Sequence, residues 1–207
     1  MIGVYAIVDP EACVEASGAR RDPRAVARAI LRGGASRLQL RGKSLPDRAL
    51  LELARELAGL AGEAGVPFVV NDRLDLALLV GASEVHLGQD DLPLIEARKL
   101  AGQLRLGRST HDLAQVRAAR DEGADRIAFG PVFPTRSKAN PDPVVGLDRL
   151  AEAVALAERP VVAIGGINLA RAPELAGLGL SEVAVISALC AAPDPEAATA
   201  RLREALA

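Results

Sequence analysis

The segment PVVAIGGI, residues 160–167, is an uninterrupted apolar run that ends in two glycines. A strand with apolar side chains on both faces is typical of a parallel sheet that helices cover. Similar short runs of β-branched or aliphatic residues recur along the whole chain, at residues 4–8, 37–40, 67–70, 84–87, 104–106, 126–129, 160–164 and 182–186. The sequence therefore predicts eight buried strands.

Helical segments separate these strands. Residues 49–57 and 113–120 are rich in Ala, Leu, Arg and Glu, and their apolar residues lie three and four positions apart, which is helix periodicity. Strands that alternate with helices form right-handed βαβ units. Glycines stand where each of five helices meets the next strand, as a left-handed C-cap requires, at residues 33–34, 65, 81, 123 and 179. We therefore predict an α/β protein with one domain over residues 1–207, a (β/α)8 TIM barrel.

An open doubly wound sheet is the alternative fold. Its usual phosphate-binding fingerprint, GxGxxG, is absent after Val8, where Asp9 and Pro10 begin a long loop that reaches Arg21. In a barrel, residues that follow all eight strands face one mouth. Because polar clusters follow six of the predicted strands, the barrel is the better prediction.

Composition excludes several classes of partner. The net charge is −2 and acidic and basic residues are mixed along the chain, which argues against a nucleic-acid partner. No apolar stretch reaches about 18 residues and the N-terminus has no charged leader, so we expect a cytoplasmic protein with no membrane partner. Cys13 and Cys190 lack metal-site spacing and are expected to be free thiols.

Cationic and hydroxyl side chains gather after two of the strands. Residues 130–138, GPVFPTRSK, follow the strand at 126–129 and offer two hydroxyls and a lysine, which suits a phosphate or diphosphate. Gln39, Arg41 and Lys43 alternate at the end of the second strand, so a continuing strand would point all three the same way.

Seven ordered motifs resemble the thiamine-phosphate synthase family, also called thiamine-phosphate pyrophosphorylase. They are YAIVD at 5–9, QLRGK at 39–43, VND at 70–72, VHLGQDDLP at 85–93, GPVFPT at 130–135, AIGGI at 163–167 and VISA at 185–188. The resemblance implies a homodimeric (β/α)8 barrel. It also implies a transferase that joins 4-amino-2-methyl-5-hydroxymethylpyrimidine diphosphate to thiazole phosphate or its carboxylate, with Mg2+ assistance, to give thiamine phosphate and pyrophosphate.

The resemblance also assigns roles to residues. The pyrimidine-diphosphate contacts are Gln39, Arg41, Lys43, Asn71, Ser109 and Lys138. The thiazole-phosphate contacts are Thr135, Ser137, Gly166, Ile186 and Ser187, with a helix expected to begin near Asn168. The metal ligands are Asp72 and Asp91. The expected catalytic groups are Arg41, Lys43, Ser109, Lys138 and His111, although charge stabilisation of the leaving group asks for no strong base.

Structural interpretations of the same residues stay open. The basic residues could form a solvated rim, and Asp72 and Asp91 could cap helices that begin near Arg73 and Pro93. Asp90 competes with Asp91 as the metal ligand. A Gly-Gly turn could serve backbone geometry alone. His86, inside an apolar strand, is expected to be a packed core residue.

Four positions depart from the family pattern: Gly42, Arg108, Ser137 and Asn140. The segment from Gly107 to Ser109, with His111 two residues on, also resembles the related thiazole tautomerases, which isomerise a thiazole phosphate carboxylate. A barrel that binds thiazole phosphate as a regulator without turnover is a third hypothesis. The retained segments at 88–91 and 134–138, together with both metal ligands, favour the synthase.

Overall fold

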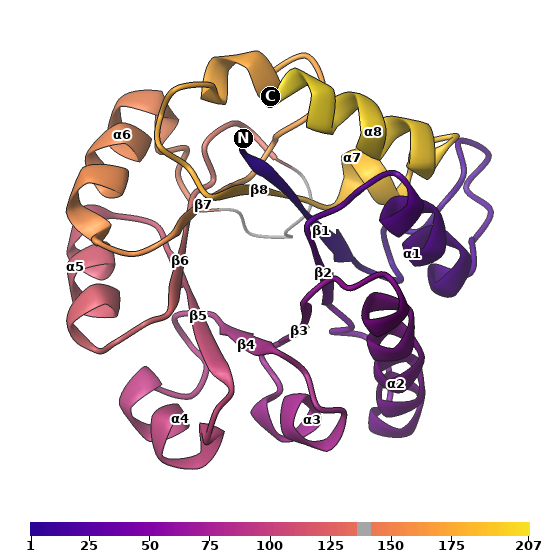
Figure 1. Cartoon of the computed structure of the whole chain (residues 1–207), viewed down its shortest axis with the longest axis horizontal. Helices are drawn as coiled ribbons and strands as arrows, with labels where there is room; N and C mark the ends of the chain where they lie inside the picture. Colours follow the sequence, from indigo (N-terminus) through magenta and orange to yellow (C-terminus); the bar gives the residue numbers. More distant parts are fainter. Residues whose placement is uncertain (136–141) are drawn as a thin grey trace.

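The computed structural model describes residues 1–135 and 142–207, and over these residues eight parallel strands form a closed barrel. Figure 1 looks into the barrel and shows the helices as a ring around it. The strands follow one another in chain order, and β8 (Glu182–Val185) pairs with β1 (Gly3–Val8) to close the ring. The predicted (β/α)8 barrel is confirmed, and the open doubly wound sheet is excluded.

The other strands are β2 (Arg37–Leu40), β3 (Phe68–Asn71), β4 (Glu84–Leu87), β5 (Arg105–Thr110), β6 (Arg126–Phe129) and β7 (Val161–Ile164). The helices are α1 (Pro23–Arg32), α2 (Asp47–Glu63), α3 (Leu74–Leu79), α4 (Leu94–Ala101), α5 (Leu113–Asp121), α6 (Gly146–Ala157), α7 (Ser187–Cys190) and α8 (Pro195–Ala205). The predicted glycine joints are confirmed; Gly34 and Gly123, for example, have φ of +90° and +81°.

The segment after β7 differs from the prediction. In place of a helix from Asn168, the chain forms one short 3₁₀ helix, η1 (Ala172–Leu175). Pro173 is tolerated only in the first turn of a helix, and Gly177, with φ of +77°, follows directly. These two residues leave room for a single turn.

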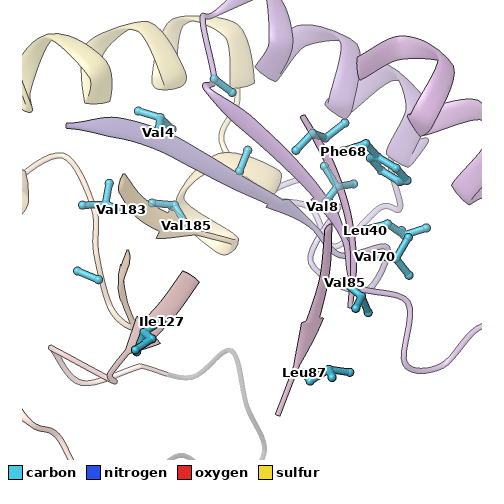
Figure 2. Close-up of a cluster of buried hydrophobic side chains, with 14 of the residues drawn as sticks. Val4, Val8, Leu40, Phe68, Val70, Val85, Leu87, Ile127, Val183 and Val185 are labelled. Carbon is cyan, nitrogen blue, oxygen red and sulfur yellow. The ribbon is translucent and has the colours of Figure 1, made fainter. Parts of the chain in front are cut away.

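The larger hydrophobic core lies between the barrel and the helices. The outward-facing side chains of the strands pack there against buried helix residues such as Leu53 and Leu57 of α2. Figure 2 shows part of this core, in which Leu40 and Val70 come from neighbouring strands in register. The aliphatic composition of the sequence therefore fills the layer between sheet and helices.

The inside of the barrel is layered, as side chains of alternate strands are in such barrels. Four charged residues form the lowest layer, which we call the ionic layer; they begin the even-numbered strands and are Arg37, Glu84, Arg126 and Glu182. Above it lies a small apolar cluster that includes Tyr5, Val69 and Val162. The polar groups of the mouth lie above that cluster.

Both cysteines are buried free thiols. Cys13 lies in the loop after β1, and Cys190 ends α7 and donates from Sγ to the Ile7 carbonyl oxygen at 3.3 Å. Across the part of the chain that the structure describes, no helix has the length and apolar character needed to cross a membrane.

Candidate functional site

Three contiguous cavities follow the carboxyl ends of the strands. The β2–β5 cavity measures about 380 Å³ and is lined by Arg41, Lys43, Asn71, Asp72, Gly88, Gln89, Asp90, Asp91, Ser109, His111, Gln115 and Asp142. The β7–β8 cavity measures about 310 Å³ and is lined by Pro134, Thr135, Gly165, Gly166, Ile167, Asn168, Arg171, Ala184, Val185, Ile186, Ser187 and Ala188.

A narrower bridging cavity of about 70 Å³ joins the two. It shares Ser109 and His111 with the β2–β5 cavity, and Thr135 and Gly165 with the β7–β8 cavity. The structure therefore brings together predicted site residues from the first fifth of the chain to its last fifth.

Two carboxylates meet in the β2–β5 cavity. The carboxyl groups of Asp72 and Asp91 lie close enough to interact, and burial together with Asp91 raises the pKa of Asp72, although Lys43 lowers it. Lys43 Nζ lies 3.1 Å from Asp72 Oδ2, and Asp91 Oδ2 accepts a 2.6 Å hydrogen bond from the Gly88 N–H. Two like charges in contact suit a divalent cation between them.

The backbone around this acidic pair also distinguishes it from a pair of helix caps. The caps of α3 and α4 are Arg73 and Pro93, and neither helix has a side-chain cap hydrogen bond, so the capping interpretation of Asp72 and Asp91 is wrong. Asp72 adopts φ of +62°, a left-handed conformation that is uncommon outside glycine. Its N–H donates to the His86 carbonyl at 2.8 Å.

Two carboxylates are too few ligands to hold a metal ion without further ligands from water or substrate. Among residues 1–135 and 142–207, no group of three or more His, Cys, Asp or Glu could hold a metal ion. Mg2+ usually keeps several waters and is bound by one or two carboxylates plus substrate phosphates. The pair of Asp72 and Asp91 matches that kind of site.

Arg41 and Lys43 differ in how they are held. The Arg41 guanidinium forms an ion pair with the buried carboxylate of Asp9, and only 16% of the Arg41 side chain is exposed. Lys43 is 55% exposed. Arg41 is therefore not part of a solvated rim, and Asp9 is a partner that the sequence reasoning missed.

Gln39 lies one layer deeper than the other two predicted β2 residues. It is buried, and its Nε2 donates to Tyr5 Oη at 2.7 Å. The ladder continues past the end of β2, because the Arg41 N–H donates to the Val8 carbonyl. Gln39 and Arg41 thus face the barrel interior, as the alternation predicts, and Lys43 lies beyond the strand.

Two histidines lie at different depths near Ser109. His86 is buried, and its Nε2 is 2.8 Å from Ser109 Oγ, which agrees with the packed core interpretation. His111 Nδ1 is 2.5 Å from the Gly130 carbonyl oxygen, which can only accept, so Nδ1 carries a proton. His111 Nε2 lies 3.4 Å from Asp142 Oδ2. Asp142 is a second cavity residue that the sequence reasoning missed.

The unusual Arg108 does not line any of the three cavities. Gly107 and Ser109 face inward, whereas Arg108 is buried and donates to the Gly88 carbonyl at 2.8 Å. It therefore supports the loop that carries Asp91. Gly42, the other described departure, allows close packing, because a β-carbon there would lie 2.5 Å from Leu50 Cδ1.

The predicted thiazole-phosphate residues Thr135, Gly166, Ile186 and Ser187 all line the β7–β8 cavity. Gly165 has φ of +99°, and a β-carbon there would lie 2.4 Å from Pro131 Cβ, so only glycine fits this turn. Ser137, Lys138 and Asn140 lie outside the described residues.

Residues 4–189 match the family model described as thiamine monophosphate synthase. The chain belongs to this family. The thiamine-phosphate synthase of Anaeromyxobacter dehalogenans (strain 2CP-C) is 52% identical over 186 residues, which cover 89% of this chain and 83% of the relative. That of Roseiflexus sp. (strain RS-1) is 44% identical, with 99% of this chain and 85% of the relative covered.

A solved structure agrees with this assignment. The thiamine phosphate pyrophosphorylase from Pyrococcus furiosus superposes with a TM-score of 0.89 at 36% identity, covering 99% of this chain and 95% of that chain. The predicted synthase family and its transferase role in thiamine biosynthesis are confirmed. The tautomerase and the regulator receive no support from these relatives.

Proposed function

We propose that the mouth of this barrel couples 4-amino-2-methyl-5-hydroxymethylpyrimidine diphosphate to thiazole phosphate and releases pyrophosphate, or couples it to the thiazole phosphate carboxylate and releases both pyrophosphate and CO2. The observation that carries the proposal is the row of three cavities. Acidic and cationic groups line one end, a glycine turn with hydroxyls lines the other, and a narrow passage joins them. The diphosphate of one substrate and the phosphate of the other could therefore bind at opposite ends, with the two rings in contact in the passage between them.

Arg41 and Lys43 would bind the diphosphate in the β2–β5 cavity. The planar guanidinium of Arg41, held by Asp9, presents a fixed fork to phosphate oxygens, whereas the exposed Lys43 acts as a mobile point charge. Ser109 would orient the group from the floor, because His86 already fixes its hydroxyl. Lys138 and Asn71 complete the proposed pyrimidine-diphosphate contacts, with Gln39 beneath them.

Asp72 and Asp91 would hold Mg2+. A bound Mg2+ would supply neutralisation of the charge that develops on the departing diphosphate. The two carboxylates fit this task because they lie close together. Lys43 is near enough to bind the same diphosphate that the Mg2+ would bind.

The bridging cavity would align the two rings. Its walls include the apolar residues Ala128, Pro131 and Ile164, against which the two rings could pack. As the bond between the pyrimidine methylene and the diphosphate oxygen breaks, the electron pair leaves with pyrophosphate, and the thiazole nitrogen traps the remaining cation. Alignment at short range accounts for much of the rate of such a step.

His111 stands at the junction of the β2–β5 and bridging cavities. We propose that its Nε2, rather than the Nδ1 that the Gly130 carbonyl occupies, would carry proton transfer in any isomerisation of a thiazole carboxylate, whereas the coupling step needs no strong base. Replacing His111 by Gln tests this role. We expect coupling to change little, and isomerisation of a thiazole carboxylate, if the protein has that activity, to disappear.

The decisive experiment incubates the purified protein with both phosphorylated rings and Mg2+. We expect thiamine phosphate and pyrophosphate in equal amounts, and neither when EDTA replaces the metal. Isomerised thiazole without coupling would contradict the proposal and favour the tautomerase. Binding of thiazole phosphate without any product would favour the regulator.

Two further properties stay predictions. A titration should show pyrimidine-diphosphate binding only when Mg2+ is present, which tests the metal separately from turnover. Sedimentation equilibrium would test the homodimer, and localisation of a tagged chain would test the cytoplasmic location.

A further inference from the structure

Arg171 places a cation at the β7–β8 cavity. It precedes the first residue of η1, and it is the only Lys or Arg among the described residues that line this cavity. The family motifs that predict the cavity do not include it. The other polar side chains among the described residues of this wall are those of Thr135, Asn168 and Ser187, and none of them carries a full charge.

Three contacts fix the position of Arg171. Its Nη1 donates to the Gly166 carbonyl at 2.7 Å, and its guanidinium carbon lies 4.9 Å from the centroid of the Phe133 ring. Its backbone N–H donates to Asn168 Oδ1 at 3.1 Å. The guanidinium therefore lies over the glycine turn and is not free in solvent.

Among the described residues, the Arg171 guanidinium donates one hydrogen bond, to the Gly166 carbonyl, although the group has five N–H donors. A hydrogen bond from a guanidinium to a phosphate is charge-assisted and about twice as strong as a neutral one. Phe133 supports the flat face of the cation without competing for those donors.

We propose that Arg171 binds the phosphate of the thiazole substrate and makes the enzyme select the phosphorylated thiazole over the free alcohol. This inference rests on the proposed function and deepens it. The glycine turn and the hydroxyls shape the cavity, whereas Arg171 supplies the charge that recognises a dianion.

The test compares Arg171→Met and Arg171→Lys with wild type in steady-state coupling assays. For thiazole phosphate, we expect KM to rise about tenfold or more in Arg171→Met, the size that loss of one charged hydrogen bond gives. Arg171→Lys should recover part of this loss. KM for the pyrimidine diphosphate and the thermal unfolding midpoint should stay unchanged.

The unphosphorylated thiazole alcohol separates charge recognition from turn support. Its kcat/KM should be the same in wild type and Arg171→Met. An equal loss with both thiazoles would show that Arg171 only supports the Gly166 turn and would overturn the inference. A matched control is Arg201→Met, because Arg201 is exposed and also donates to a backbone carbonyl, that of Ala197. This control should behave as wild type.

Failure of the proposed function has a different signature. If wild type couples no rings, the proposed reaction is wrong, and calorimetric binding of thiazole phosphate then decides the inference alone. Binding that weakens about tenfold in Arg171→Met supports phosphate recognition, and unchanged binding overturns it.

Discussion

The two ends of the barrel interior arrange their acidic side chains differently. The ionic layer contains two arginines and two glutamates, and the mouth contains Arg41, Lys43, Asp72 and Asp91. In the ionic layer each glutamate lies between both arginines, with Glu182 Oε2 3.0 Å from Arg37 Nε and 2.8 Å from Arg126 Nη1. At the mouth the two acids contact each other.

This difference separates stability from function. In the ionic layer each glutamate is paired with two arginines, although Glu84 Oε1 accepts no hydrogen bond from the described residues, whereas two neighbouring carboxylates at the mouth would be stabilised by a cation. Burial raises the pKa of Glu84 even in the ionic layer, although Arg37 and Arg126 oppose that effect. At the mouth, burial and the neighbouring Asp91 both raise the pKa of Asp72, and Lys43 opposes them only in part.

Removing one acid from the ionic layer should have the largest effect. Glu182→Ala leaves Arg37 and Arg126 buried with one anion, and we expect the free energy of unfolding to fall by about 3–5 kcal/mol. Urea denaturation measures it, and Glu182→Gln provides a milder variant if the alanine variant does not fold. The control is Glu196→Ala, from an exposed pair with Arg32, with an expected loss below about 1 kcal/mol. Equal losses in the two alanine variants would show that the buried ionic layer contributes no more to stability than an exposed ion pair does.

Removing one acid from the mouth should affect activity and spare stability. We expect Asp91→Asn to lower the coupling rate by about 100-fold, equivalent to about 2.7 kcal/mol, because one proposed metal ligand is lost. The urea midpoint should stay the same or rise, since the contact between like charges is relieved. Asp90→Asn is the control, because Asp90 is exposed and lines the same cavity. A larger loss in the Asp90 variant would move the metal assignment to Asp90.

Gly107 lies between the ionic layer and the mouth. A substitution there tests whether strain near the ionic layer affects the reaction at the mouth. A β-carbon there would lie 2.6 Å from His86 Nδ1 and 2.8 Å from Glu84 Oε1. We expect Gly107→Ala to cost about 1–3 kcal/mol of stability, as overpacking does. Gly59→Ala, on α2 with no atom within 4 Å of the new carbon, should instead stabilise slightly. If Gly107→Ala changes only the coupling rate, strain passes upward through His86 to Ser109.

An exposed ion pair at the lower end should have the smallest effect. Partial burial raises the pKa of Asp125, but hydrogen bonds from Arg98 and from the Leu106 N–H lower it to a net value below the usual range. A lowered pKa stabilises the fold above the ordinary carboxyl value of about 3.9, and this stabilisation is lost as the pH falls. We expect Asp125→Asn to cost less than about 1 kcal/mol at pH 7 and nothing near pH 2. A loss that does not depend on pH would show that packing is responsible.

The sequence predicted the strands well except where the barrel interior becomes polar. Seven strands lie within one residue of the predicted ranges, but β5 runs from Arg105 to Thr110 and the prediction ended at residue 106. The last four residues of β5 read GRST, which lacks an apolar pattern because Ser109 lines the mouth and Arg108 supports a neighbouring loop. The polar end of this strand was therefore predicted as a loop.

Most residues of the site were predicted because they sit in local motifs after strands. Asp9, Asp142 and Arg171 were missed, since their roles depend on partners that only the folded barrel brings near. The ionic layer was missed for the same reason, as Arg37 and Glu182 are separated by 145 positions. Knowing the barrel register would have exposed it, because its members all begin even-numbered strands.

The ionic layer also determines the route by which substrates enter and products leave this enzyme. With charged side chains and the apolar cluster filling the lower bore, nothing can pass through the barrel, so both substrates arrive and both products depart through a single doorway. Thiamine phosphate bound at this mouth would block both the pyrimidine diphosphate and the thiazole phosphate. It should therefore be a competitive inhibitor with respect to each substrate.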